Sequence, residues 1–224
     1  MKHHFLTLAT ITTLLLLLST PPTTTAANAA DNIVYDVIGE PLQAGQTYYM
    51  VPYDYSDVGG GGLTWLQKTK VTCAPYYVSQ ENVNTNFGQK IAFYPQTTGQ
   101  TDITLSSILN IVFSSFTPPI NCPGTSNVWS VAADPATRLN FIELRGSRGT
   151  RDLRTWFTIE DVDQGGYKIS YCPRNRRVDC GSLGIVSRDF GRWLGVNGTN
   201  PLTFVFESEE FFLNKALGTK SYAA

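Results

Sequence analysis

The stretch VYDVIGEPLQAGQTYYMVP, from Val34 to Pro52, contains the pattern that decides the fold. Glycine and proline recur in its first part, and a run of β-branched and aromatic residues, TYYMVP, ends it. Turn-forming residues that alternate with such runs indicate strands rather than helices. The same alternation continues about every eight to twelve residues, in the runs KIAFY, NIVFSSF, VWSVAA, LNFIEL, TWFTIEDV, YKISYC, LGIVS and LTFVFE. We therefore predict an all-β sandwich or barrel.

The first 29 residues have the features of a secretory signal peptide. A cationic start precedes a mostly apolar run, Phe5–Leu18, and small residues at Ala27–Ala29 suit cleavage. This run is too short to span a bilayer, and no later segment is long and apolar enough to do so. We expect residues 30–224 to form a single soluble domain that is secreted to the extracellular space or the vacuole, without a membrane partner.

Charge and histidine content exclude several classes of function. Cleavage would remove both histidines and Lys2, so that 16 of the 17 basic residues remain against 18 acidic ones. Without histidine, neither a Ser-His-Asp or Cys-His nucleophilic site nor a histidine-ligated metal site can form. A hydrolase with paired carboxylates stays open, but no helix-borne acidic pair stands out. We predict no enzyme and no metal site.

The near-neutral charge also argues against a nucleic-acid partner, which would need a basic face. The one basic stretch is LRGSRGTRDLR, residues 144–154, which has Glu143 and Asp152 beside its arginines. We interpret it as a solvated hairpin or loop, with a contact surface as the alternative.

The four cysteines outside the leader allow three pairings. Cys172 and Cys180 enclose the polar, turn-like insert PRNRRVD and are expected to bridge each other. Cys73 and Cys122 would then close a long loop, worth about 4 kcal/mol in the chain-entropy model, against about 2.6 kcal/mol for the short one. Zinc is not expected, because the chain has no CxxC knuckle.

A weak internal repeat suggests three units. An aromatic residue near the start of a strand recurs in QTYYMV, SNVWSV and GGYKIS, at unequal spacing. Four tryptophans accompany these runs, and we expect them to pack in the core rather than to stack on a ligand; they are Trp65, Trp129, Trp156 and Trp193.

The opening stretch resembles the N-terminal signature of the plant Kunitz (soybean trypsin inhibitor type) family, which includes miraculin-like members. The matching positions are Val34, Asp36, Gly39, Glu40, Leu42, Tyr48 and Met50, whereas Ile38 departs from the signature. The resemblance continues through GGGLTW, Cys73-Ala74-Pro75, NCPGTSNVWSV, WFTIEDVDQGGYKISYCP, DCGSLGIV and NPLTFVFE. It implies a β-trefoil of about twelve strands with pseudo-threefold symmetry and two disulfides, Cys73–Cys122 and Cys172–Cys180.

In the inhibitors that this chain resembles, a protease-binding loop follows a strand that ends in a proline step. Here that step is Tyr94-Pro95, so the resemblance implies a reactive loop of Gln96, Thr97, Thr98, Gly99, Gln100, Thr101 and Asp102. Counting from Pro95 places Thr97 in the specificity pocket of the protease, and counting back from LNIVF places Gly99 there. Neither suits trypsin, whose pocket takes Lys or Arg, whereas Thr97 suits a small elastase-like pocket.

A second departure concerns the support of this loop. Inhibitory relatives brace it with an asparagine, and Glu40 stands in the matching place. An ionised carboxylate only accepts hydrogen bonds, so the brace cannot be the same. We predict a monomeric secreted endopeptidase inhibitor, of serine proteases but not of trypsin through this loop. The alternative is a miraculin-like, seed-storage or defence protein that has lost inhibition.

Two further surface sites are candidates. The insert CPRNRRVDC presents Arg174, Arg176 and Arg177 as a possible second reactive loop, although exposed arginines more often serve solubility. Asn197-Gly198-Thr199 is an acceptor for an N-linked glycan. We expect no cofactor; relatives that bind chlorophyll share the fold, and here only a backbone carbonyl could ligate its magnesium.

Overall fold

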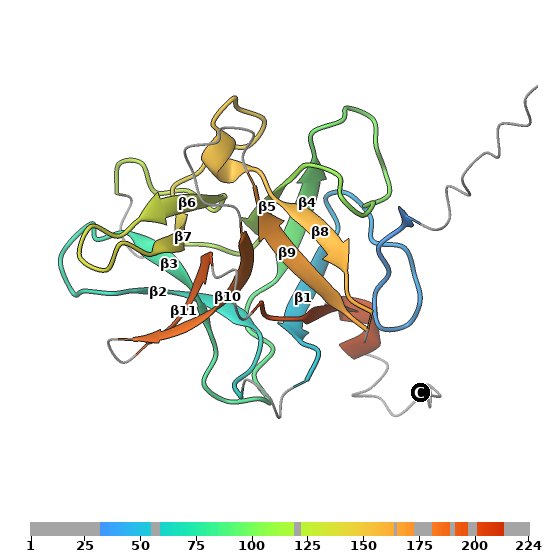
Figure 1. Cartoon of the computed structure of the whole chain (residues 1–224), viewed down its shortest axis with the longest axis horizontal. Coiled ribbons are helices and arrows are strands. Elements are labelled where there is room, and N and C mark those ends of the chain that lie inside the picture. Colours follow the sequence, from blue (N-terminus) through green and yellow to red (C-terminus); the bar gives the residue numbers. More distant parts are fainter. Residues whose placement is uncertain are drawn as a thin grey trace, which may run out of the picture. The chain divides into compact units, whose positions relative to one another are not determined.

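The computed structural model describes residues 32–54, 59–118, 122–163, 165–172, 181–188, 191–196 and 201–212. Its elements, shown in Figure 1, are twelve strands, a short 3-10 helix, η2, and a helical turn at residues 209–212. Their bounds are β1 (Thr47–Pro52), β2 (Leu63–Gln67), β3 (Tyr76–Gln80), β4 (Ile91–Pro95), β5 (Leu109–Phe113), β6 (Trp129–Ala133), β7 (Asn140–Leu144), η2 (Leu153–Thr155), β8 (Thr158–Asp161), β9 (Tyr167–Tyr171), β10 (Gly181–Arg188), β11 (Gly191–Val196) and β12 (Phe204–Ser208). The prediction of an all-β chain with about twelve strands is confirmed.

Six strands close a barrel by antiparallel pairing. β1 pairs with β4 and with β12, β4 pairs with β5, and β9 pairs with β8 and with β12. An isolated bridge between Leu109 and Phe157 joins β5 to the residue before β8 and completes the ring. Because every barrel strand has a partner on both sides, the barrel exposes no free sheet edge.

The other six strands form three hairpins, β2–β3, β6–β7 and β10–β11, which lie to the left of the barrel strands in Figure 1. Strands β3, β7 and β11 pair with one another in all three combinations, at Tyr77↔Glu143, Phe141↔Gly195 and Ser79↔Trp193. Each third of the chain thus supplies one hairpin to a closed triangle. This arrangement is the pseudo-threefold β-trefoil that the resemblance implied.

The predicted repeat was only partly right. QTYYMV and GGYKIS form β1 and β9, which hold equivalent places in the barrel, but SNVWSV leads into β6, a hairpin strand. Aromatic residues at strand starts reflect burial in the core, and both barrel and hairpin strands need such burial.

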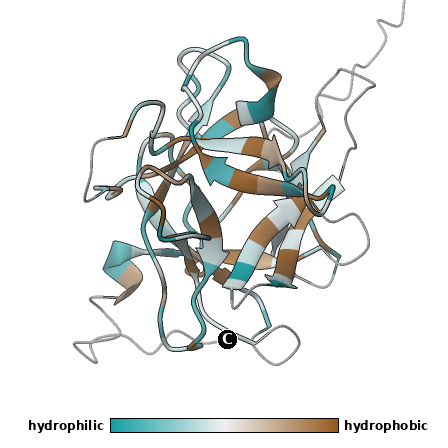
Figure 2. Cartoon of the chain, turned by 90° about the vertical axis from the view of Figure 1, so that its left-hand side faces the viewer, coloured by the Kyte–Doolittle hydropathy of each residue, from teal (hydrophilic) through white to brown (hydrophobic). Residues whose placement is uncertain are grey.

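The core fills the barrel with apolar side chains from alternate strand positions, as the banding of the strands in Figure 2 shows. Trp129 is fully buried and lies between Phe113 and Phe157, with ring centroids 5.6 and 6.2 Å away. Burial of each large apolar side chain contributes about 1.5–3 kcal/mol to folding. Trp193 is also buried as predicted, whereas Trp65 and Trp156 are only partly buried.

One disulfide is described, where two were predicted. Cys73 and Cys122 are joined with a Cα–Cα distance of 5.3 Å. Cys172 is disulfide-bonded, but Cys180, its predicted partner, lies outside the described residues. Within the part of the chain that the structure describes, no helix could cross a membrane, and no cluster of three or more metal-ligating side chains is found.

Candidate functional site

The loop that connects β4 and β5 is closed at its base by strand pairing. Pro95 is the last residue of β4, as predicted, and stands opposite Leu109 in the β4–β5 ladder. The amide of Gln96 donates to the carbonyl of Ile108 at 2.8 Å and extends this ladder by one bond. Residues 97–107 therefore leave the barrel from a fixed base, on its upper side in Figure 1.

The returning half of the loop is held in the core. Ile103 is fully buried, and its amide donates to the carbonyl of Leu42 at 2.8 Å. Its own carbonyl accepts from the amide of Val34 at 2.9 Å, and Val34 and Leu42 are also fully buried. The N-terminal segment thus adds a strand-like partner to a loop that has no regular strand of its own.

A side-chain hydrogen bond fixes the point at which the loop leaves the core. Nε2 of Gln43 donates to Oδ1 of Asp102 at 2.6 Å. The amide of Ala44 donates to the carbonyl of Thr101 at 2.7 Å, and Nε2 of Gln100 donates to the carbonyl of Asp102 at 2.8 Å. Because each bond involves a different atom of residues 100–102, this part of the loop is ordered without a partner protein.

A tight turn positions the segment that carries Gln43. Oδ1 of Asp36 accepts from the amides of Ile38 and Glu40, both at 3.0 Å, and Gly39 adopts a φ of +81°, which suits glycine. The phenol oxygen of Tyr48 accepts from the amide of Gln43 at 2.9 Å. Burial raises the pKa of Tyr48, so its phenol stays neutral here.

The tip of the loop is exposed and contains a turn. Gln96 to Gly99 and Thr101 are exposed, whereas Gln100 and Asp102 are partly buried. The amide of Gln100 lies 3.4 Å from the carbonyl of Thr97, and Gly99 has a φ of +81° with no heavy atom within 4 Å of an added Cβ. A positive φ at the third residue of such a turn is typical of type II.

Gln43 is a supporting residue that sequence reasoning missed. The resemblance pointed to the position of Glu40, but Glu40 is exposed and the side-chain bond to the loop comes from Gln43. The two bonded residues, Gln43 and Asp102, lie 59 positions apart in the sequence, so no local pattern could pair them. The other predicted site residues, Arg174, Arg176, Arg177 and Asn197, lie outside the described residues.

A cleft of about 550 Å³ opens beside the loop. Its lining includes Gln96 and Thr98 of the loop and Arg148, Thr150 and Trp156 of the segment between β7 and β8. Thr97, which lies between the first two, is not among the residues that line the cleft. The side chain of Thr97 is therefore not part of the cleft wall, and it is exposed to solvent.

The chain is similar to a known protein family over most of its length. A family model described as "Trypsin and protease inhibitor", of the Kunitz legume type, matches residues 34–208. The chain is 32% identical to miraculin from Synsepalum dulcificum over 83% of this chain and 87% of that one, and 32% identical to Kunitz trypsin inhibitor 3 from Arabidopsis thaliana over 74% of each.

Solved structures agree with these sequence matches. The soybean trypsin inhibitor in its complex with porcine pancreatic trypsin superposes with a TM-score of 0.66 at 25% identity, covering 80% of this chain and 99% of that one. The matched residues include the N-terminal segment, the braced loop and all twelve strands. Sequence, trefoil and loop support together show that the chain belongs to the Kunitz family of plant trypsin and protease inhibitors.

Proposed function

We propose that this protein is a Kunitz-type endopeptidase inhibitor that acts through residues 96–102. The observation that supports this proposal most strongly is the division of the loop into an exposed tip and a hydrogen-bonded return. A substrate-like inhibitor needs a segment that enters a protease cleft without a large ordering cost. The bonds from Leu42, Gln43 and Ala44 to the return provide that order in the free protein.

Thr97 is the better choice for the residue that fills the specificity pocket. The chain that enters a protease cleft is extended, with negative φ, whereas Gly99 has a φ of +81° and no side chain. Thr97 is exposed and does not line the cleft beside the loop. A small β-branched side chain suits a small, elastase-like pocket and does not provide the cation that trypsin binds.

A protease panel tests this proposal. The mature protein is titrated against trypsin, chymotrypsin, elastase, subtilisin and a papain-like protease, and slowly cleaved inhibitor is mapped by mass spectrometry. We expect stoichiometric inhibition of a serine protease with a small pocket and cleavage within residues 96–102. Thr97→Arg should gain trypsin inhibition, and the matched control Thr98→Arg should not. If both variants gain trypsin inhibition equally, or if neither gains it, the assignment of Thr97 to the specificity pocket is wrong.

A non-inhibitory function is the second candidate. The similarity to miraculin extends over 83% of the chain, and the brace of the loop differs from the one that inhibitory relatives use. Absence of a complex with every protease of the panel would favour this function. Cleavage after Arg174, Arg176 or Arg177 would instead move the reactive site to the insert between Cys172 and Cys180.

Several finer features complete the proposal. We infer a leader that is cleaved near residue 29, secretion to the extracellular space or vacuole, a monomer without enzyme activity, and a second bridge, Cys172–Cys180. Asn197 would carry an N-linked glycan. Intact mass before and after deglycosylation, together with N-terminal sequencing and non-reducing peptide mapping of the protein from its own tissue, tests these features directly.

A further inference from the structure

The segment between β7 and β8 carries a concentration of positive charge beside the proposed inhibitory loop. Residues 145–154 contain four arginines and one aspartate, a net charge of +3 in a chain whose net charge is −1. All four arginines are exposed. The segment forms a loop that ends in η2, and it rises on the same upper side as the β4–β5 loop in Figure 1.

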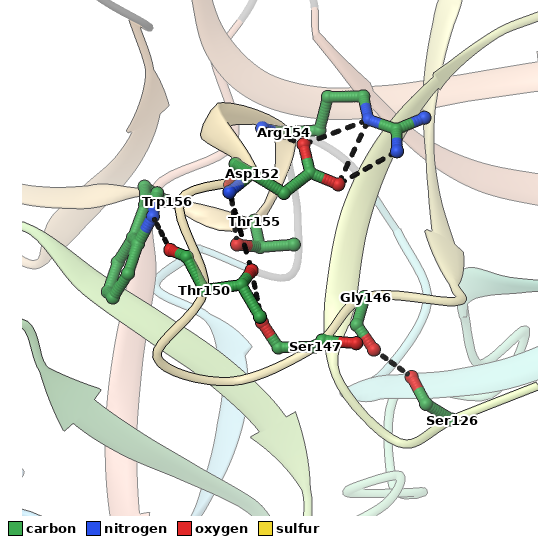
Figure 3. Close-up of polar contacts among 8 residues, drawn as sticks. All are labelled: Ser126, Gly146, Ser147, Thr150, Asp152, Arg154, Thr155 and Trp156. Atoms are coloured by element: carbon green, nitrogen blue, oxygen red, sulfur yellow. Dashed lines mark hydrogen bonds and ion pairs between the residues drawn. The ribbon is translucent and has the colours of Figure 1, made fainter.

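Hydrogen bonds within this segment hold its backbone, and Figure 3 shows them. Thr150 accepts a bond from the indole of Trp156 through its carbonyl, at 3.1 Å. Asn110 of β5 is fully buried; its Oδ1 accepts from the amide of Gly149 at 2.9 Å, and its Nδ2 donates to the carbonyl of Thr155 at 2.7 Å. One buried side chain therefore ties the arginine segment to the strand that follows the inhibitory loop.

The arginines of the segment differ in their partners. Arg154 forms a two-point ion pair with Asp152, at 3.0 and 2.8 Å, and this pair lowers the pKa of the Asp152 carboxyl. Arg148 and Arg151 have no acidic partner within the described residues. The only acid of residues 145–154 is thus engaged. Of the other three arginines, Arg145 acts electrostatically on the Glu143 carboxyl, and Arg148 and Arg151 remain available to an external anion.

Arg148 is also held in a defined orientation. Its guanidinium carbon lies 4.0 Å from the centre of the Tyr94 ring, on the strand that leads into the inhibitory loop. A guanidinium stacked on an aromatic face keeps its N–H groups free at its edge, where they match a carboxylate. Arg148 and Arg151 line the same cleft as Gln96 and Thr98, the two neighbours of Thr97.

We propose that Arg148 and Arg151 form a second contact site, which binds an acidic side chain on the surface of the protease that holds Thr97. This inference rests on the proposed function. A protein that holds Thr97 comes close to the cleft, because the chain neighbours Gln96 and Thr98 line it. Two uncompensated cations at that place, one of them oriented by Tyr94, favour a partner with negative charge beside its active site, and they speed its association.

Charge reversal tests the second contact site in the full mature chain. Arg148→Glu/Arg151→Glu is compared with Arg138→Glu/Arg188→Glu, which changes net charge equally at exposed arginines on the β6–β7 turn and the end of β10. Association rates with trypsin, chymotrypsin, elastase and subtilisin are measured at low and high salt. For the protease inhibited best, we expect the first variant to associate roughly tenfold more slowly at low salt, with the difference lost at high salt. The control should stay within about twofold.

The outcomes separate this inference from the proposed function. Unchanged association of Arg148→Glu/Arg151→Glu with a protease that the wild-type protein inhibits overturns the second contact site alone. Equal slowing in the control variant overturns it too, because the effect then belongs to net charge. If the wild-type protein inhibits no protease, the proposed function fails and the second contact site fails with it. Circular dichroism and thermal melts of each variant confirm that it is folded.

Discussion

Removal of the Gln43 side chain should loosen the proposed inhibitory loop without unfolding the barrel. Nε2 of Gln43 donates to the Asp102 carboxylate at 2.6 Å, and Asp102 is only partly buried. A hydrogen bond to a charged group contributes about 1.5–3 kcal/mol to stability when it is shielded from water. Because water reaches this site, we expect a contribution of about 1.4 kcal/mol from this bond. The backbone bonds from Leu42 and Ala44 would remain, so the loss is local.

This energy should appear in two measurements. Since a looser loop must be ordered again in the complex, Gln43→Ala should raise the inhibition constant about tenfold, which corresponds to about 1.4 kcal/mol. Hydrogen exchange of a peptide that covers residues 96–105 should become faster by a similar factor, and this readout does not require that a target protease is known.

Two control variants make the result decisive. Gln46→Ala removes the same type of side chain from an exposed position three residues after Gln43, and Glu40→Ala tests the position that the family pattern indicated. Both should behave like the wild-type protein in both measurements. If Gln43→Ala matches Gln46→Ala, or if Glu40→Ala is the impaired variant, the assignment of the brace to Gln43 is wrong.

Three further predictions concern stability. Replacing Cys73 and Cys122 together by alanine should lower the free energy of unfolding by about 4 kcal/mol in denaturant titrations, since the bridge closes a long loop; a loss below about 1 kcal/mol would contradict the chain-entropy estimate. Asp36→Ala should cost about 1–2 kcal/mol, because two amides lose their acceptor, and Asp36→Asn should recover part of it. Burial raises the pKa of the Glu143 carboxyl, so the folded state favours its neutral form. As the pH rises above the usual carboxyl range, this group must ionise while buried, and the free energy of unfolding falls. Glu143→Gln should therefore raise the melting temperature at pH 7 but not at pH 4, by about 2–4 °C if the gain is about 1 kcal/mol, whereas exposed Glu210→Gln should change neither.

The sequence by itself determined the all-β class, and its resemblance to a known family indicated the location of the proposed loop. Short β-branched and aromatic runs between turn residues predict strands because side-chain periodicity and turn chemistry are local properties. The family resemblance pointed to Tyr94-Pro95 as the step before the loop, and the structure places this step at the end of β4. The resemblance of the stretch from Val34 to Pro52 added the trefoil, which the closed triangle of β3, β7 and β11 confirms.

Only the tertiary structure decided what supports the loop and what lies beside it. The bond from Gln43 to Asp102 joins residues 59 positions apart, and the stacking of Arg148 on Tyr94 joins two different thirds of the trefoil. Such contacts depend on how the barrel closes, and local sequence patterns do not predict that closure. The sequence, through its family resemblance, therefore pointed to the segment that we propose is offered to a partner, whereas the fold decided which side chains hold it and which charges surround it.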